Sequence, residues 1–212
     1  MNYSVKKFGF LSYSNIEIID ITKAWFAISV AFGIVLGGLS SLFFKAFIIS
    51  AVAVGLGFLL HELSHKVVAQ RYKYKAEFRS FDEMLFLAVI MSFFGFVIAA
   101  PGAVMIQAFK YNNKHNGMIS AAGPLTNIIL ALLFLAAMFL TGNFSLLDKP
   151  VGTVVSLPIF SSILLIGFFV NSWLALFNMI PVWQFDGAKI FRWNKIIYFS
   201  IVIVSAFLVF GL

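Results

Sequence analysis

Residues 44–69 read FKAFIISAVAVGLGFLLHELSHKVVA and predict one helix that is long enough to cross a lipid bilayer. The part from Ala46 to Leu60 contains no charge and no proline. His61 and His65 follow it, and because they are four residues apart they lie on one helix face, with Glu62 beside them. In soluble zinc hydrolases this spacing supplies two metal ligands and a general base. Ionisable groups are costly in hydrocarbon, which favours a functional site over a chance match whose histidines only meet lipid headgroups.

The composition indicates an integral membrane protein. Of the 212 residues, 62% are hydrophobic and 11% are charged, and the mean hydropathy is +1.01. This length accommodates roughly five or six spans of ~20 residues, and we expect no separate soluble regulatory domain. The absence of cysteine excludes disulfides and thiolate ligands. The net charge of +7 lies in short loops beside apolar runs, where it sets topology, so no nucleic-acid partner is expected.

The apolar runs predict a single integral-membrane domain over residues 1–212, built as an all-α bundle of five to six transmembrane helices. Its core is expected at about residues 44–187, with the first and last spans peripheral. The alternating residues 16–21 (IEIIDI) are compatible with a short strand or an interfacial turn. The expected spans are 22–39, 44–69, 118–140, 154–180 and 196–211, whereas the run 84–100 is ambiguous.

The distribution of basic residues indicates whether residues 84–100 cross the membrane. If this run enters the bilayer and returns, thirteen of the fifteen basic residues lie on the cytoplasmic side, and Lys45 and Lys149 lie outside. A full crossing would place nine inside and six outside. The positive-inside rule therefore favours a small re-entrant hairpin. Only that arrangement brings His65 and Asp186 to the same side, and it is allowed where the backbone is buried in protein.

Asp186 is the candidate third metal ligand. It lies between the helix-breaking Pro181 and Gly187, where a helix unwinds and a carboxylate can turn inward. The alternative role is an aspartate that caps the following turn. Catalytic zinc commonly has three protein ligands and one open position, so His61, His65 and Asp186 predict one Zn²⁺ per chain, near the cytoplasmic side of the bilayer.

Three further residues are candidates for the chemistry. Glu62 is the expected general base, because it is next to His61 on the same turn without being needed as a ligand. Zinc would activate a water molecule, and Asn127 or Asn178 can donate a hydrogen bond to the developing oxyanion. Either asparagine can instead form a buried hydrogen bond between helices.

These motifs make the chain similar to the site-2 proteases, the intramembrane zinc metalloproteases of regulated intramembrane proteolysis. HELSH (61–65) resembles the family's H-E-x-x-H motif, and Asn178-x-x-Pro181 with Asp186-Gly187 resembles its N-x-x-P…D-G element. GPLTN (123–127) resembles the element that opens the intervening core helix. The resemblance covers about residues 44–187, although the segment before residue 123 is longer than in the most compact members. The residues that resemble the membrane-embedded hairpin beside the active site are Pro101, Gly102, Ala103 and Val104.

The resemblance implies a zinc metalloendopeptidase that cleaves single-span membrane proteins within or near their transmembrane segments and releases cytosolic regulators. The edge of the hairpin can bind an extended substrate by strand addition. The other expected partners are membrane lipids. Two alternatives stay open. A non-catalytic zinc-binding membrane protein with a sensing or structural role would not need Glu62, and a metal transporter would need ionisable residues along other spans, which contain almost none.

Overall fold

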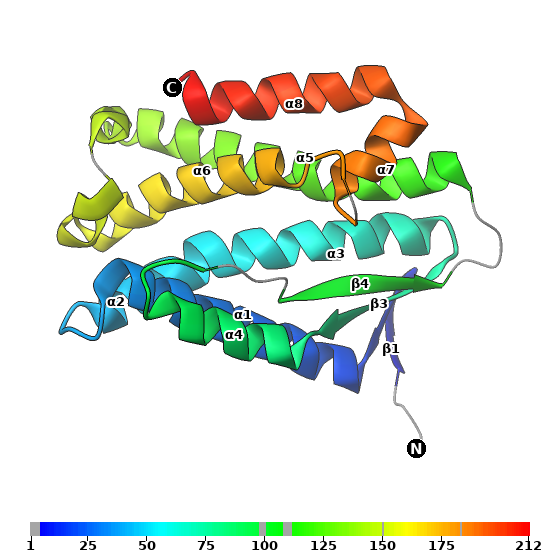
Figure 1. Cartoon of the computed structure of the whole chain (residues 1–212), viewed down its shortest axis with the longest axis horizontal. Helices are drawn as coiled ribbons and strands as arrows, with labels where there is room; N and C mark the ends of the chain where they lie inside the picture. The colour runs from blue at the N-terminus through cyan, green and yellow to red at the C-terminus, as the bar shows by residue number, and fades with distance from the viewer. Residues whose placement is uncertain (1–4, 98–100, 108–111, 150, 183) are drawn as a thin grey trace.

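The computed structural model describes residues 5–97, 101–107, 112–149, 151–182 and 184–212, most of which are helical (Figure 1). A π-helical turn, Ala51–Gly55, joins α2 to α3 in one continuous helix. The helices are α1 (Asn15–Gly37), α2 (Phe43–Ser50), α3 (Leu56–Arg71), α4 (Asp82–Ser92), α5 (Asn113–Leu140), α6 (Ile159–Phe177), α7 (Asp186–Trp193) and α8 (Lys195–Phe210). The strands are β1 (Val5–Phe8), β2 (Leu11–Ser14), β3 (Lys75–Ser80) and β4 (Gly102–Gln107).

Four helices are long and apolar enough to cross a membrane. They are α1, the continuous α2–α3 helix, α5 and α6, with 23, 29, 28 and 19 residues. Helix α8 is shorter, at 16 residues. Helix α4 has 11 residues, which at ~1.5 Å per residue is about half the thickness of the hydrocarbon core. The predicted helical membrane protein is confirmed, and the total of five to six spans stays a prediction.

The largest cluster of buried side chains joins α5, α6, α7 and α8 to α1, α2 and the π-helical turn, and Phe58 of α3 packs against it. Figure 1 shows these helices stacked in layers, with α8 on one side and the α1, α2 and α4 layer on the other. Large apolar side chains also point outward, which suits surfaces that meet lipid instead of water. Outward-facing examples on α4, α5 and α8 are Phe86, Ile129, Leu133, Phe139, Ile203 and Phe207.

The N-terminal region differs from both alternatives considered for residues 16–21. These residues belong to α1, which begins at Asn15, where the hydroxyl of Ser14 accepts a hydrogen bond from the backbone N–H of Glu17. The prediction of a strand or turn was wrong because Glu17 and Asp20 are not exposed to lipid. Both are buried, and Glu17 pairs with Lys66 of α3. The polar start of the helix is therefore compatible with packing against its neighbours.

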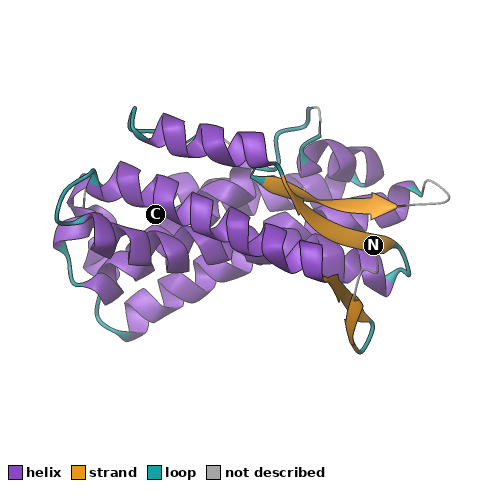
Figure 2. Ribbon diagram, turned by 90° about the horizontal axis from the view of Figure 1, so that it is seen from below, coloured by secondary structure: helices purple, strands orange, loops and turns teal. Residues whose placement is uncertain are grey.

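A two-stranded ribbon lies beside α3, and its strand β3 was not predicted from the sequence. β4 pairs antiparallel with β3, with Phe78 opposite Val104 and Ser80 opposite Gly102. Pro101 precedes the strand, and Gly102, Ala103 and Val104 form its first half. These residues are thus one strand of a ribbon whose partner comes from the segment that follows α3. Figure 2 shows the strands toward one end of the helical bundle.

The segment between α3 and α5 starts and ends at the same end of the bundle, as Figure 1 shows. β3 leads into α4, and the chain then returns to β4. The predicted run 84–100 thus begins in α4, and its last three residues, 98–100, lie outside the described part of the chain.

Candidate metal centre

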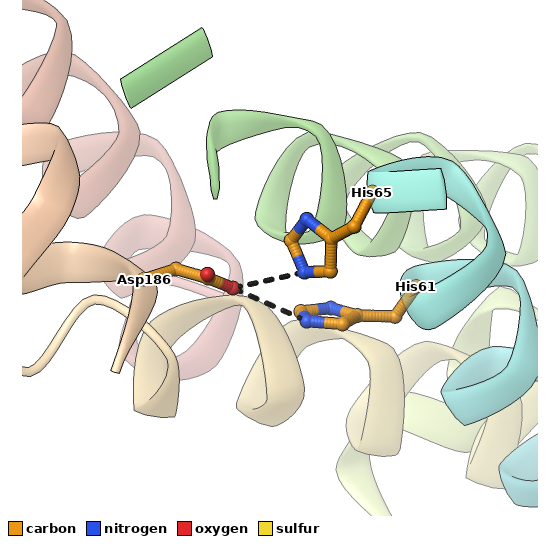
Figure 3. Close-up of side chains that lie close together, drawn as sticks. All are labelled: His61, His65 and Asp186. Carbon is orange, nitrogen blue, oxygen red and sulfur yellow. Dashed lines mark ion pairs between the residues drawn. The ribbon is translucent and has the colours of Figure 1, made fainter. Parts of the chain in front are cut away.

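Three side chains converge where α3 meets α7. Figure 3 shows His61 and His65 pointing from α3 toward Asp186, the first residue of α7. The Nε2 atoms of His61 and His65 lie 3.4 and 3.1 Å from the same oxygen, Oδ2 of Asp186. All three residues are buried. The pair of histidines and the distant aspartate identified from the sequence are therefore one cluster in space.

The loop after α6 is shaped to deliver Asp186. α6 ends at Phe177, and the backbone N–H of Gly187 donates to the carbonyl of Asn178 at 2.8 Å. A β-carbon at position 187 would collide with the backbone of Met179, so this close approach requires glycine. The hydroxyl of Tyr198 donates to the carbonyl of Met179 at 2.9 Å and fixes the same loop from α8.

Hydrogen bonds on the far side of each imidazole orient the two histidines. Nδ1 of His65 lies 2.8 Å from the carbonyl of Ile119, and Nδ1 of His61 lies 2.5 Å from Oδ1 of Asn127. Both partners are acceptors, so each Nδ1 carries the proton and each Nε2 keeps its lone pair toward Asp186. Metal-binding histidines commonly have this tautomer and this kind of partner.

Asn127 is itself fixed by the bundle. Its amide nitrogen donates to Oδ1 of Asn171 on α6 at 2.9 Å and to the carbonyl of Gly57 at 3.3 Å. Asn171 in turn donates to the carbonyl of Gly167 at 2.8 Å. Neither asparagine side chain is accessible to solvent. A buried polar chain thus runs from α6 through α5 to the imidazole of His61.

A glycine makes room for the cluster. A β-carbon on Gly123 of α5 would lie 2.5 Å from Nε2 of both His61 and His65. Position 123, beside both Nε2 atoms, therefore tolerates no side chain. The close approach of α5 to α3 thus explains the glycine of the GPLTN segment identified in the sequence.

The donor set and its spacing fit a zinc ion. Ligand atoms about 2.0–2.2 Å from zinc lie about 3.4 Å apart at tetrahedral angles. The two histidine–aspartate distances are close to that value, and one ligand atom from each of the three residues lies within 4.8 Å of the others. Two imidazole nitrogens and one carboxylate are a donor set found at catalytic zinc, with a fourth position left open.

A cavity of about 700 Å³ opens beside the cluster. Its wall is formed by His61, Glu62 and His65 of α3, by residues 102–106 of β4 and by residues that flank Asp186. Oε2 of Glu62 accepts a hydrogen bond from the backbone N–H of Val104 at 3.2 Å. Glu62 therefore lies on the cavity wall between the histidines and β4.

The remaining predicted residues have different surroundings. Asn178 lines the cavity, but its side-chain amide donates to the carbonyl of Leu174 at 2.8 Å. Asn127 does not line the cavity. Sequence reasoning missed Asn171, although an asparagine within an apolar span is itself a signal of a buried hydrogen bond. It also missed Lys189, whose Nζ lies 3.7 Å from Oδ1 of Asp186 and which lines the cavity.

The fold and the site together define a class: multi-pass membrane proteins with a buried metal-binding cluster next to a peptide-sized cavity. The particular family follows from comparison with known proteins. Residues 49–196 match the model of Peptidase family M50, the family of the site-2 proteases, so the chain belongs to that family. It is a zinc metalloprotease, and the resemblance noted from the sequence is confirmed.

A relative agrees with this assignment. The chain is 40% identical over 187 residues to a protein of Methanocaldococcus jannaschii named "Putative zinc metalloprotease", and the match covers 88% of each chain. No solved structure matches the chain.

Proposed function

We propose that this protein is an intramembrane endopeptidase that cleaves membrane-anchored proteins within or near their transmembrane segments. The observation that carries this proposal is the location of the cluster. His61, His65 and Asp186 are buried between helices that have the length and composition of membrane spans. A protease built this way meets its substrates inside the bilayer, so single-span proteins are the substrate class that fits it.

His61, His65 and Asp186 would hold one zinc ion per chain. The bound ion would supply Lewis-acid activation of a water molecule and of the scissile carbonyl. The protein keeps both imidazoles in the required tautomer through Asn127 and the carbonyl of Ile119. Asn127 is therefore a positioning residue in this proposal, because its amide group is already bonded to His61, Asn171 and Gly57.

Glu62 would act as the general base and later as the general acid. It would take a proton from the attacking water and deliver it to the leaving amine nitrogen. The hydrogen bond from the backbone N–H of Val104 holds its carboxylate toward the cavity. Asn178 lies on the cavity wall and is the better placed of the two asparagines to contact substrate.

The free edge of β4 would bind the substrate. A transmembrane helix has all its backbone hydrogen bonds formed, so it must unwind before its peptide bonds can be attacked. β4 is bonded to β3 on one edge, and residues 102–106 face the cavity. An unwound segment can therefore add to this edge as a strand, with its backbone alongside Glu62.

Topology completes the proposal. The run 84–100 would enter the bilayer and return, because α4, in which it begins, is too short to span it. The metal centre would then lie nearer the cytoplasmic side, and cleavage would release the cytosolic part of a substrate, consistent with a role in regulated intramembrane proteolysis. The membrane lipids around the bundle are its other partners.

The experiment that tests this function compares wild type with Glu62→Gln on a panel of purified single-span substrates in proteoliposomes. Glutamine keeps the size of the side chain but cannot accept a proton near neutral pH. We expect zinc content to be unchanged and cleavage to fall by at least ~10²-fold, the usual scale for a positioned general base. Cleavage by this variant at the wild-type rate would overturn the proposed role of Glu62 as general base.

A further inference from the structure

One buried ion pair has no part in the chemistry described above. Nζ of Lys66 lies 2.6 Å from both carboxylate oxygens of Glu17, and neither side chain is exposed. Lys66 directly follows His65 on α3, whereas Glu17 belongs to the first turn of α1. The ammonium group also lies 3.5 Å from the centre of the Tyr13 ring, in cation–π contact. Burying two charges is costly, so this arrangement calls for a reason beyond stability.

Glu17 makes one more contact, and it reaches the ribbon. Its Oε1 accepts a hydrogen bond from the backbone N–H of Phe78 in β3 at 2.9 Å. Phe78 is the residue directly opposite Val104 of β4 in the register of the two strands. Val104 is the residue whose N–H donates to Glu62.

The geometry of an antiparallel pair explains this coincidence. Opposite residues alternate between pairs that bond to each other and pairs whose N–H groups point away from the partner strand. Phe78 and Val104 form an outward-pointing pair, because both N–H groups donate elsewhere. Two carboxylates therefore bind the outward-pointing N–H groups of this one residue pair: Glu17 binds that of Phe78, and Glu62 binds that of Val104.

The same face of helix α1 also contacts the last residue of β3 and the first residue of α4. The hydroxyl of Ser80 donates to Asp20 at 3.2 Å, and Nζ of Lys23 lies 2.7 Å from Asp82. Glu17, Asp20 and Lys23 are three residues apart, so they share one helix face. A two-stranded ribbon is marginally stable alone, which means that its position depends on such external contacts.

We propose that Glu17, whose charge is paired with Lys66, is a positioning residue. By binding Phe78 of β3 it fixes where the paired strand β4 lies relative to Glu62. The inference rests on the proposed function, in which β4 receives the substrate strand and Glu62 is the base. Even a displacement of the ribbon by less than the length of one residue would disturb the hydrogen bond between Val104 and Glu62. It would also displace the edge of β4 that aligns the scissile bond. Glu17 itself does not touch substrate.

Two double variants separate the effect of losing the hydrogen-bond acceptor of Phe78 from the effect of losing the buried charges. Glu17→Met/Lys66→Met removes both charges and leaves Phe78 without an acceptor. Glu17→Gln/Lys66→Met removes the same charges but keeps an amide oxygen that can accept from Phe78. Neither variant leaves a lone buried charge, which is the change that would threaten folding. Glu17→Asp is a third variant, which keeps the charge pair but is too short to bridge Lys66 and Phe78 together. The matched control is Glu77→Gln, which removes a carboxylate from the neighbouring residue of β3, where it pairs with Arg79.

The first readout is backbone amide exchange of Phe78 and Val104 in detergent micelles, measured with zinc content. Loss of one hydrogen bond is worth about 1 kcal/mol, so we expect exchange about fivefold faster in Glu17→Met/Lys66→Met and in Glu17→Asp. Exchange in Glu17→Gln/Lys66→Met and in the control should stay within about twofold of wild type, and all variants should retain zinc.

The second readout is cleavage of a single-span substrate, where kcat/KM should fall with faster exchange and recover in the glutamine variant. Equal exchange and equal cleavage in the methionine and glutamine double variants would overturn the proposal and leave Glu17 a folding residue. If wild type cleaves no single-span substrate while the exchange difference appears, the positioning of the ribbon by Glu17 stands and the proposed intramembrane cleavage fails.

Discussion

At the residue scale, the metal centre depends on neighbours that never touch the ion. His61 has Asn127 at Nδ1, Gly123 against its ring and Asp186 at Nε2. Asn127 fixes the tautomer of the imidazole, Gly123 limits its tilt, and Asp186 lies in the direction in which Nε2 points. These contacts are buried, and a buried polar group that loses its hydrogen-bond partner is costly, so they should be costly to change.

Gly123→Ala tests the tilt. The added methyl group would lie 2.5 Å from Nε2 of both histidines, so α5 must move away or the rings must turn. We expect zinc affinity to fall about 10- to 100-fold, the range seen when the support of a ligand is disturbed. Competition with a zinc-binding dye measures this affinity. Leu125→Ala, two residues further along α5 and exposed, should bind zinc like wild type.

Asn127→Leu tests the tautomer. The leucine side chain has a similar volume but offers no acceptor to Nδ1 of His61, and it leaves Asn171 without its donor. The imidazole can then carry its proton on Nε2, where it blocks coordination. Zinc affinity should fall by about 10- to 100-fold. Asn178→Leu, on the cavity wall, should lower cleavage more than zinc binding, and the reverse result would exchange the roles given to the two asparagines.

The three residues of the buried cluster were predictable from the sequence, whereas the residues that support them were not. His61 and His65 stand out because ionisable groups are rare in apolar helices, and Asp186 follows a proline that ends a span. By contrast, the acceptor for His65 is the backbone carbonyl of Ile119, which no sequence pattern reveals. Asn171 and Lys66 become informative only when the helices that face them are known.

At the element scale, the ribbon explains how a short segment inside a helical bundle can present a strand edge. Residues 75–80 (KAEFRS) contain three charged residues and no β-branched residue, so their composition gives little indication of a strand. Their pairing is decided by tertiary contacts: Glu17 binds Phe78, and Gln70 donates to the carbonyl of Ala76 at 2.9 Å. For the same reason the start of α1 was misjudged, since Glu17 and Asp20 are satisfied by β3 and α3 instead of water.

The proposal that residues 84–100 are re-entrant gives a topology prediction. α3 ends and α5 begins at the same end of the bundle, so cysteines that replace Lys73 and Asn113 should react from the same side of the membrane. The positive-inside rule makes that side the cytoplasm. A cysteine that replaces Lys149, after α5, should react from the opposite side. A membrane-impermeant thiol reagent on intact cells and inverted vesicles measures this, because the protein has no cysteine of its own. Opposite labelling of positions 73 and 113 would make the segment a true span.

At the scale of the whole molecule, the centre joins two halves of the chain. His61 and His65 belong to the α3 side of the bundle, whereas Asp186 belongs to the α6–α7–α8 side and is fixed there by the contact of Gly187 with Met179. The sequence alone indicated that these residues share a side of the membrane. It could not indicate the packing of α5 between them, in which Gly123 and Ile119 both contact the histidines.

Zinc removal should therefore destabilise the whole fold and not only inactivate the site. A ligand present at 100 times its Kd adds about 2.7 kcal/mol to the folded state. For a chain of this size that corresponds to roughly 5–10 °C in Tm. Without zinc, the carboxylate of Asp186 faces two imidazoles alone, and the contact between α3 and α7 loses its central bond. Thermal unfolding in detergent, with and without a chelator, measures the shift. Asp186→Ala should unfold at a temperature that the chelator barely changes, because its cluster lacks one of three ligands. A chelator-induced shift of the same size in Asp186→Ala would show that the stabilising zinc binds elsewhere, and the link between the two halves of the bundle would then need another explanation.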